Sequence, residues 1–146
     1  MNEDRYEIKF ILNESGITHA QSLLAKIGAN KKYQDRDVNS LYFDNINLDA
    51  VRDNLSGTTP RHKVRLRWYE GETLEKFDPN LEIKTRNGRL GSKVLYPFPK
   101  IRKSIVTKSI FSLSKEVIQK SRQFNIAHKS INSYLLPMLI VQYRRE

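Results

Sequence analysis

The feature that most constrains the fold is a strict alternation of charged and apolar residues in two segments. Residues 63–69 read KVRLRWY, and residues 81–86 read LEIKTR. A period of two is typical of a β-strand with one face toward a core. Since residues i and i+2 lie about 6.8 Å apart along a strand, each polar face presents a ladder of charges. The sequence therefore predicts two amphipathic strands whose polar faces are mainly cationic.

The rest of the chain predicts an α+β protein, in which helices lie between and beside strands. Asn13 begins a helix that ends at Gly28, and the pair Asn87 and Gly88 is typical of a hairpin turn. Apolar spacing predicts two more helices, one with Leu48, Val51 and Leu55, and one over about residues 110–124. Strands are expected over residues 5–12, 38–43, 63–69, 81–86, 90–96 and 138–145.

Length and composition favour a single domain that binds an anion. The chain has 146 residues, which suits one domain. Its net charge of +10 indicates an anionic partner, which could be nucleic acid, an acidic membrane surface or a phosphate-rich molecule. The absence of cysteine excludes disulfides and thiolate metal sites, and it fits a reducing cytoplasm. The sequence has no apolar run of about 20 residues, the length that spans a bilayer.

The cations share one register on three predicted strands. Lys9 lies on the polar face of the first strand, the ladder of residues 63–67 on another, and Lys84 and Arg86 on the next. Like charges on neighbouring strands repel, unless water or a polyanion relieves the repulsion. Glu7 and Glu82 lie among the cations and could hold a divalent ion that bridges phosphates. A merely solvated sheet face explains the same pattern, and periodicity alone leaves the two interpretations open.

Five segments in order carry a resemblance to a known family. They are RYEIKF at residues 5–10, SLYFDN at 40–45, KVRLRWY at 63–69, LEIKTR at 81–86 and PMLIVQYRR at 137–145. Their order resembles the vacuolar transporter chaperone (VTC) domain, the polyphosphate polymerase branch of the triphosphate tunnel metalloenzymes, which are CYTH-like. The resemblance covers nearly the whole chain. Each motif is weak alone, and their order makes the resemblance fairly specific.

The resemblance implies an antiparallel β-barrel whose bore is lined by Arg, Lys and Glu. In that family ATP or another nucleoside triphosphate binds with a divalent metal, Mn²⁺ or Mg²⁺, and its terminal phosphoryl group passes to polyphosphate. Arg65, Arg67 and Lys84 would then be catalytic, and Glu7 and Glu82 would be metal ligands. The expected substrate-binding residues are Lys9, Arg65, Arg67, Lys84, Lys93, Tyr143 and Arg145.

Two departures from the family pattern refine this expectation. Arg5 stands where hydrolases and cyclases of the superfamily have a first Glu, which favours the polymerase branch. The remaining strands, with a metal-binding Glu, would follow Glu146. Residues 1–146 are thus expected to form a single VTC-like domain truncated at its C-terminal end, with an incomplete barrel. Such a chain is expected to bind phosphate chains but to synthesise little polyphosphate.

Two other functions compete with phosphoryl transfer. One is a non-catalytic module that senses polyphosphate or inositol phosphates. The other is a nucleic-acid-binding sheet, which ranks last because Tyr69 is the one aromatic residue clearly placed among the cations. The expected location is cytoplasmic, including the cytoplasmic side of a membrane, with any membrane association indirect. Trp68 is expected in the core, and His19, His62 and His128 are expected at the surface.

Overall fold

The computed structural model describes residues 10–30, 34–71, 79–98, 108–123 and 135–145. It is an α+β structure, as expected, and from Glu14 on its order of elements follows the predicted one. No helix within these ranges combines the length and the apolar character needed to cross a membrane. The elements are α1 (Glu14–Lys26), β1 (Arg36–Asp44), α2 (Asp49–Ser56), β2 (Arg61–Gly71), β3 (Asn80–Asn87), β4 (Leu90–Pro97), α4 (Ile110–Gln123) and β5 (Leu136–Arg145).

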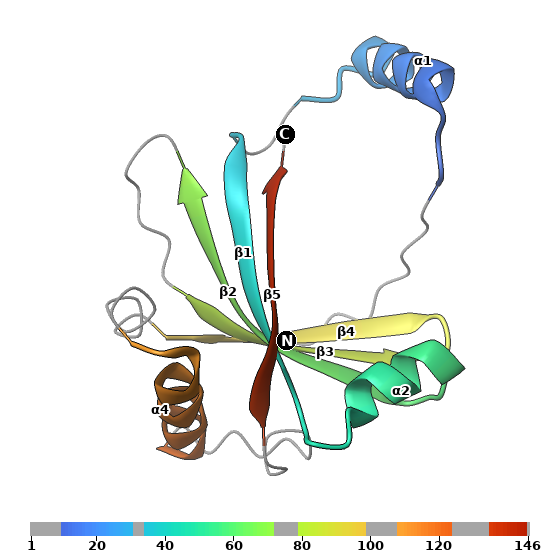
Figure 1. Ribbon diagram of the computed structural model, residues 1–146. Helices are drawn as coiled ribbons and strands as arrows, with labels where there is room; N and C mark the ends of the chain where they lie inside the picture. The colour runs from blue at the N-terminus through green and yellow to red at the C-terminus, as the bar shows by residue number, and fades with distance from the viewer. Residues whose placement is uncertain (1–9, 31–33, 72–78, 99–107, 124–134, 146) are drawn as a thin grey trace.

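The strands form one antiparallel sheet with the order β4-β3-β2-β1-β5. The sheet twists strongly, so that β3 and β4 run across the direction of β1 and β5 in Figure 1. The long strand β2 joins the two parts, because its first residues pair with β3 and its last residues pair with β1 alone. In the described residues β4 and β5 are the two edges of the sheet, which is open. The closed barrel implied by the resemblance is therefore not observed in this part of the chain.

The core lies on one face of this sheet. Alternate residues of the three central strands supply it, and α4 covers it with Leu113 and Val117. Trp68 packs against this core, as its position on the apolar face predicts. Each fully buried aliphatic side chain contributes about 1.5–3 kcal/mol to folding. The buried sheet residues are Leu41, Phe43, Val64, Leu66, Leu81 and Ile83.

The predicted hairpin joins β3 to β4. Asn87 pairs with Leu90, so the turn consists of Gly88 and Arg89. Gly88 has a φ of 58°, which a residue without a Cβ adopts at little cost. The Nε of Arg86 also donates a hydrogen bond to the carbonyl of Gly88, at 3.1 Å. This turn fixes the register of β3 against β4, and with it the alignment of their lysines.

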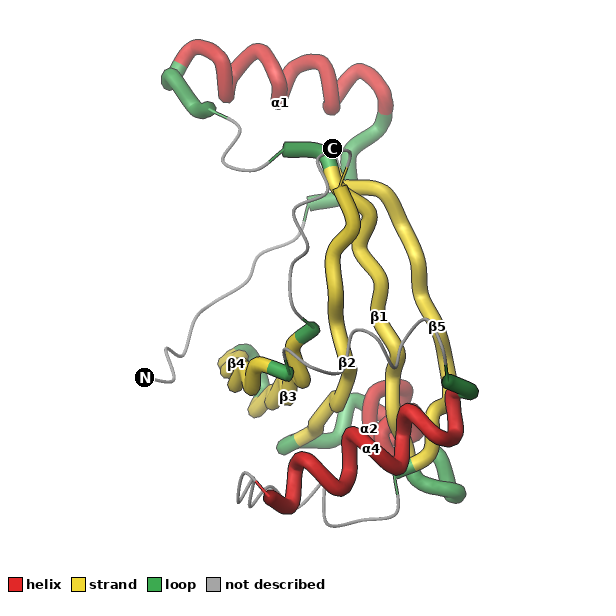
Figure 2. Tube along the Cα trace, turned by 90° about the vertical axis from the view of Figure 1, so that its left-hand side faces the viewer, coloured by secondary structure: helices red, strands yellow, loops and turns green. Residues whose placement is uncertain are grey.

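One expectation for the N-terminal part needs correction, and another is confirmed. The predicted strand over residues 5–12 does not extend to Phe10, Ile11 and Leu12, which lie outside any strand, and residues 1–9 lie outside the described residues. The helix after Asn13 is present as α1, but it has no buried residue. It stands apart from the sheet in Figures 1 and 2. The apolar spacing of α1 thus predicted its helical structure but not its packing.

Candidate functional site

The face of the sheet opposite the core carries most of the predicted site residues. Lys63 on β2 is directly opposite Lys84 on β3, and Lys84 is directly opposite Lys93 on β4. We call these three residues the lysine row. Neighbouring strands lie about 4.8 Å apart, and like charges directly opposite each other destabilise a sheet. The row therefore aligns three cationic residues across three neighbouring strands.

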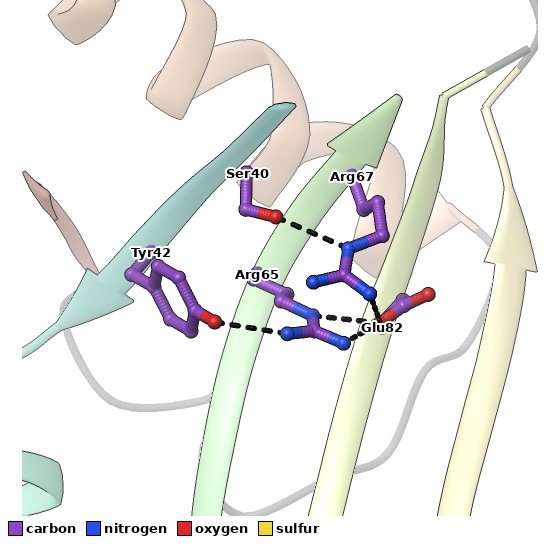
Figure 3. Close-up of polar contacts among 5 residues, drawn as sticks. All are labelled: Ser40, Tyr42, Arg65, Arg67 and Glu82. Carbon is purple, nitrogen blue, oxygen red and sulfur yellow. Dashed lines mark hydrogen bonds and ion pairs between the residues drawn. The ribbon is translucent and has the colours of Figure 1, made fainter. Parts of the chain in front are cut away.

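Beside the lysine row, two arginines form a connected polar cluster (Figure 3). The Nε of Arg65 donates a hydrogen bond to Oε2 of Glu82 at 2.7 Å, and its Nη2 forms an ion pair with the same oxygen. The Nη1 of Arg65 donates to the hydroxyl of Tyr42 at 2.9 Å. Arg67 donates from Nε to the hydroxyl of Ser40 at 3.1 Å, and its Nη1 lies 4.0 Å from Oε2 of Glu82. Strands β1, β2 and β3 all contribute to this arginine cluster.

The arginine cluster is largely removed from water. The side chain of Glu82 is 4% exposed and that of Arg65 is 17% exposed. Burial of Arg65 opposes its charged form, but the Glu82 carboxylate and the hydrogen bonds to Tyr42 and Glu82 outweigh this effect and raise the pKa of Arg65. Arg65 therefore remains a cation at any pH at which the protein is folded. Two guanidinium groups share one carboxylate, which leaves the cluster with an excess of positive charge.

Of the two expected metal ligands, the one that the structure describes is already paired with a cation. Glu82, one of the two expected ligands, has Oε2 bound by Arg65, and two guanidinium groups beside a carboxylate repel a second cation. Among the residues that the structure describes, no three His, Asp or Glu side chains are grouped as metal ligands. Glu7, the other expected ligand, lies outside the described residues.

The far end of the same face carries a second group of cations and aromatic rings. Arg36 on β1 is opposite Arg145 on β5, and Tyr143 is two residues from Arg145 on the same face. The guanidinium of Arg36 lies over the ring of Tyr69, 4.4 Å from its centroid. Tyr69 thus lies on the basic side, as predicted, and it already contacts a cation. Tyr69 is six positions beyond Lys63 along β2, a distance of about 20 Å.

The predicted residues therefore divide into three groups. Arg65 and Arg67 meet at Glu82, and Lys84 and Lys93 belong to the lysine row. Tyr143 and Arg145 lie at the far end of the same face. Lys9 and Glu7 lie outside the described residues, so their prediction stays untested.

Several residues of this face were not in the predicted site. Lys63 shares the alternation of Arg65 and Arg67, so the pattern already indicated it. Arg36 was missed because the strand was expected to begin at residue 38, whereas β1 begins at Arg36. Tyr42 and Ser40 have no charge, and only the register of β1 against β2 identifies them as partners of the arginines.

The remaining polar residues have structural roles. The carboxylate of Asp44 is buried and accepts hydrogen bonds from the backbone amides of Asn45, Ala50 and Val51, at 2.8, 3.0 and 3.1 Å. It therefore caps the start of α2. The Nδ1 of His62 is 3.0 Å from the hydroxyl of Thr85. His19 is exposed on α1, and His128 lies outside the described residues.

Comparison with known families agrees with the order of the strand motifs. The family model of the VTC domain matches residues 4–146, which include every strand of the sheet. No curated protein sequence matches the chain. The family match thus covers the lysine row, the arginine cluster and the far end together.

Proposed function

Because the chain belongs to the VTC domain family, we propose that its basic sheet face binds triphosphate and polyphosphate. We further propose that this face acts in phosphoryl transfer from a nucleoside triphosphate to polyphosphate. The family match supports a polyphosphate-related function. The face also supports this choice of ligand, because its rows of cations match a linear chain of phosphates better than they match a single anionic group.

The observation that carries the proposal is the lysine row beside the arginine cluster. Lys63, Lys84 and Lys93 are aligned across three strands, and Arg65 and Arg67 follow Lys63 along β2. A polyanion placed over these residues would contact cations in two directions, across the strands and along them. Lysine supplies a point charge to phosphate oxygens, and arginine supplies a planar pair of donors. The two residue types together suit a chain of phosphates that presents oxygens on all sides.

The proposed chemistry needs alignment and charge stabilisation more than covalent participation by the protein. In phosphoryl transfer, negative charge is spread over the oxygens of the transferring group and shifts to the leaving oxygen. Arg67 and Lys84 would neutralise this charge from two neighbouring strands. Arg65 would also help to neutralise this charge while it stays paired with Glu82. The divalent metal remains an expectation of the resemblance, and Glu82 is paired with arginine instead.

A non-catalytic sensing role is the second candidate, and one observation favours it. Glu82 is the expected metal ligand within the described residues, and its contact with Arg65 makes it a partner of a cation instead. A module that only binds polyphosphate needs the cations and not a metal. Binding and turnover must therefore be measured separately.

One experiment with two readouts tests the proposal. Calorimetry at a fixed salt concentration compares tripolyphosphate, ATP and AMP. A gel assay then follows polyphosphate formation from ATP with Mg²⁺, with Mn²⁺ and with chelator. We expect tripolyphosphate and ATP to bind at least tenfold more tightly than AMP, because each additional phosphate can contact further Lys and Arg side chains of the face. Metal-dependent polyphosphate synthesis would support phosphoryl transfer.

Each outcome has a defined meaning. Equal affinity for AMP and tripolyphosphate would contradict the binding proposal. Tight binding of tripolyphosphate without any synthesis would show that residues 1–146 bind phosphate chains without turnover, which favours sensing for this chain.

A further inference from the structure

Strand β1 places two hydroxyl groups beside the arginines of β2. Tyr42 is directly opposite Arg65 in the strand register, and Ser40 is directly opposite Arg67. The hydroxyl of Tyr42 accepts a hydrogen bond from Nη1 of Arg65 at 2.9 Å, and the hydroxyl of Ser40 accepts one from Nε of Arg67 at 3.1 Å. Each arginine of the cluster thus has its own hydroxyl acceptor on the neighbouring strand.

The guanidinium of Arg65 is held from two sides. Tyr42 on β1 contacts its Nη1, and Glu82 on β3 contacts its Nε and Nη2. Figure 3 shows the guanidinium between these two side chains. Because each of its three nitrogen atoms has a partner, the guanidinium plane has a fixed orientation.

Arg65 keeps donors for a ligand within this arrangement. A guanidinium group has five N–H donors. The described contacts of Arg65 use at most three of them, one from each nitrogen, so that at least two remain. The side chains of Arg65 and Arg67 are 17% and 15% exposed, which leaves part of each guanidinium within reach of a ligand in solvent.

The chemistry of the two acceptors on β1 preserves the charge of the arginines. A hydroxyl accepts a hydrogen bond without adding a negative charge, whereas a carboxylate would neutralise its partner. Of the five residues in Figure 3, only Glu82 is acidic, and two guanidinium groups share it. The hydroxyls therefore orient the guanidinium groups and leave their excess positive charge for an anion.

We infer that Tyr42 and Ser40 are positioning residues, which orient the guanidinium groups of Arg65 and Arg67 for the phosphates. The inference rests on the proposed function, since it takes phosphate binding at the arginine cluster as given. An arginine that is free to rotate loses this freedom when a ligand immobilises it, and the loss weakens binding. An arginine that is already oriented avoids part of the loss. Each hydroxyl thus raises the affinity through its arginine.

Removal of either hydroxyl tests the inference. Tyr42→Phe keeps the aromatic ring, and neither this change nor Ser40→Ala alters the charge of the face. We expect each variant to weaken tripolyphosphate binding about three- to tenfold in calorimetry, because its arginine is no longer oriented before the ligand binds. The control is Tyr96→Phe, which should leave the affinity unchanged. Tyr96 is opposite Leu81 and packs against the core on the other face of the sheet.

A second set of variants separates positioning from a general loss of structure. Lysine has a single charged amino group and no guanidinium plane that a hydroxyl could orient. Tyr42→Phe should therefore lose its effect on affinity in an Arg65→Lys background and keep it in an Arg67→Lys background. Ser40→Ala should show the reverse dependence. A purely structural effect would lower the affinity equally in both backgrounds.

The outcomes separate this inference from the proposed function. If Tyr42→Phe and Ser40→Ala bind tripolyphosphate as tightly as the unmodified protein, the positioning role is overturned and the phosphate site stands. Equal losses in both lysine backgrounds would also overturn the positioning role. If the unmodified protein does not bind tripolyphosphate, both proposals fail. Circular dichroism at the titration temperature checks that each variant is folded, and if one hydroxyl variant does not fold, the other tests the inference by the same comparison.

Discussion

At the scale of single residues, Arg65 and Arg67 differ although they occupy equivalent positions of one alternating segment. Arg65 neutralises Glu82, whose side chain is only 4% exposed. Arg67 reaches the same carboxylate only at 4.0 Å and donates to the hydroxyl of Ser40. Removing one partner of a buried ion pair leaves an uncompensated charge, which is strongly destabilising. Arg65 should therefore serve both stability and binding, and Arg67 mainly binding.

The first variants at this scale are Arg67→Ala and Arg67→Lys. Loss of the guanidinium should remove charge-assisted hydrogen bonds worth about 1.5–3 kcal/mol. The affinity for tripolyphosphate should then fall about ten- to hundredfold, as calorimetry can measure. Lysine should restore only part of this loss, because a point charge cannot reproduce the planar donors. Complete rescue by lysine would contradict a role that depends on the shape of the guanidinium.

Arg65→Ala is the matched comparison. It should weaken binding and also lower the free energy of unfolding by about 3 kcal/mol, because Glu82 loses its partner. Unfolding of both alanine variants by denaturant measures the difference. Equal stability of the two would show that Arg65 has no structural role beyond that of Arg67.

The sequence predicted the side on which these residues lie but not their contacts. Alternation alone placed Arg65, Arg67 and Lys84 on one face. The pairing of Arg65 with Glu82 depends on the register of β2 against β3, which brings together residues 17 positions apart. No local pattern determines that register. The expectation that Glu82 is a metal ligand was therefore made without knowing that Arg65 lies against it.

At the scale of elements, α2 depends on a residue of the preceding strand. The residue before the helix, Leu48, has a φ of 56°, and its side chain forms no capping hydrogen bond. The carboxylate of Asp44, at the end of β1, bonds to the backbone amides of Ala50 and Val51 instead. The sequence predicted the helix but gave Asp44 no role. The contact also holds the start of α2 against the end of β1.

Asp44→Ala tests this dependence. Loss of a helix cap costs about 0.5–2 kcal/mol, and here buried amides also lose their acceptor. We expect the free energy of unfolding to fall by about 2 kcal/mol in denaturant titrations. Asp49→Ala is the control, because Asp49 is exposed in the first turn and its carboxylate accepts from the side chain of Asn45. A larger loss in Asp49→Ala than in Asp44→Ala would contradict the capping role.

Elements with a local signal were predicted well, and elements that depend on distant contacts were not. Polar and apolar residues alternate clearly in strands β2 and β3, and Gly88 marks the hairpin turn from β3 to β4. The predicted strand at residues 5–12 alternates just as clearly, yet Phe10–Leu12 lie outside any strand. A strand needs a neighbour to satisfy its backbone, and a sequence pattern does not identify that neighbour.

At the scale of the whole molecule, the basic face links ligand binding to stability. The lysine row and the arginine cluster gather several cations on one face of the folded protein, and these residues are farther apart on average in the unfolded chain. A polyanion that binds this face only in the folded state therefore stabilises the folded protein. The closed barrel of the family remains a prediction, because closure requires contacts beyond those of the five described strands.

Tripolyphosphate should therefore raise the midpoint of thermal unfolding. At a concentration about 100 times its Kd, it should add about 2.7 kcal/mol. For a chain of this size the shift is about 5–10 °C. The shift should shrink as sodium chloride screens the charges, and AMP at matched ionic strength should produce a much smaller one. An equal shift with AMP would show a general salt effect rather than binding to the lysine row.

The open edge at β5 has a consequence for the exchange of backbone hydrogens with solvent. Among the described strands, β5 pairs with β1 alone, and successive amides of an antiparallel strand point to opposite sides. Every second amide of Leu136–Arg145 therefore points away from β1 and exchanges with deuterium faster than its neighbours. A further strand laid along this edge would slow the fast amides and leave the slow ones unchanged. The outer amides of β5 thus report, residue by residue, whether the sheet has gained another strand.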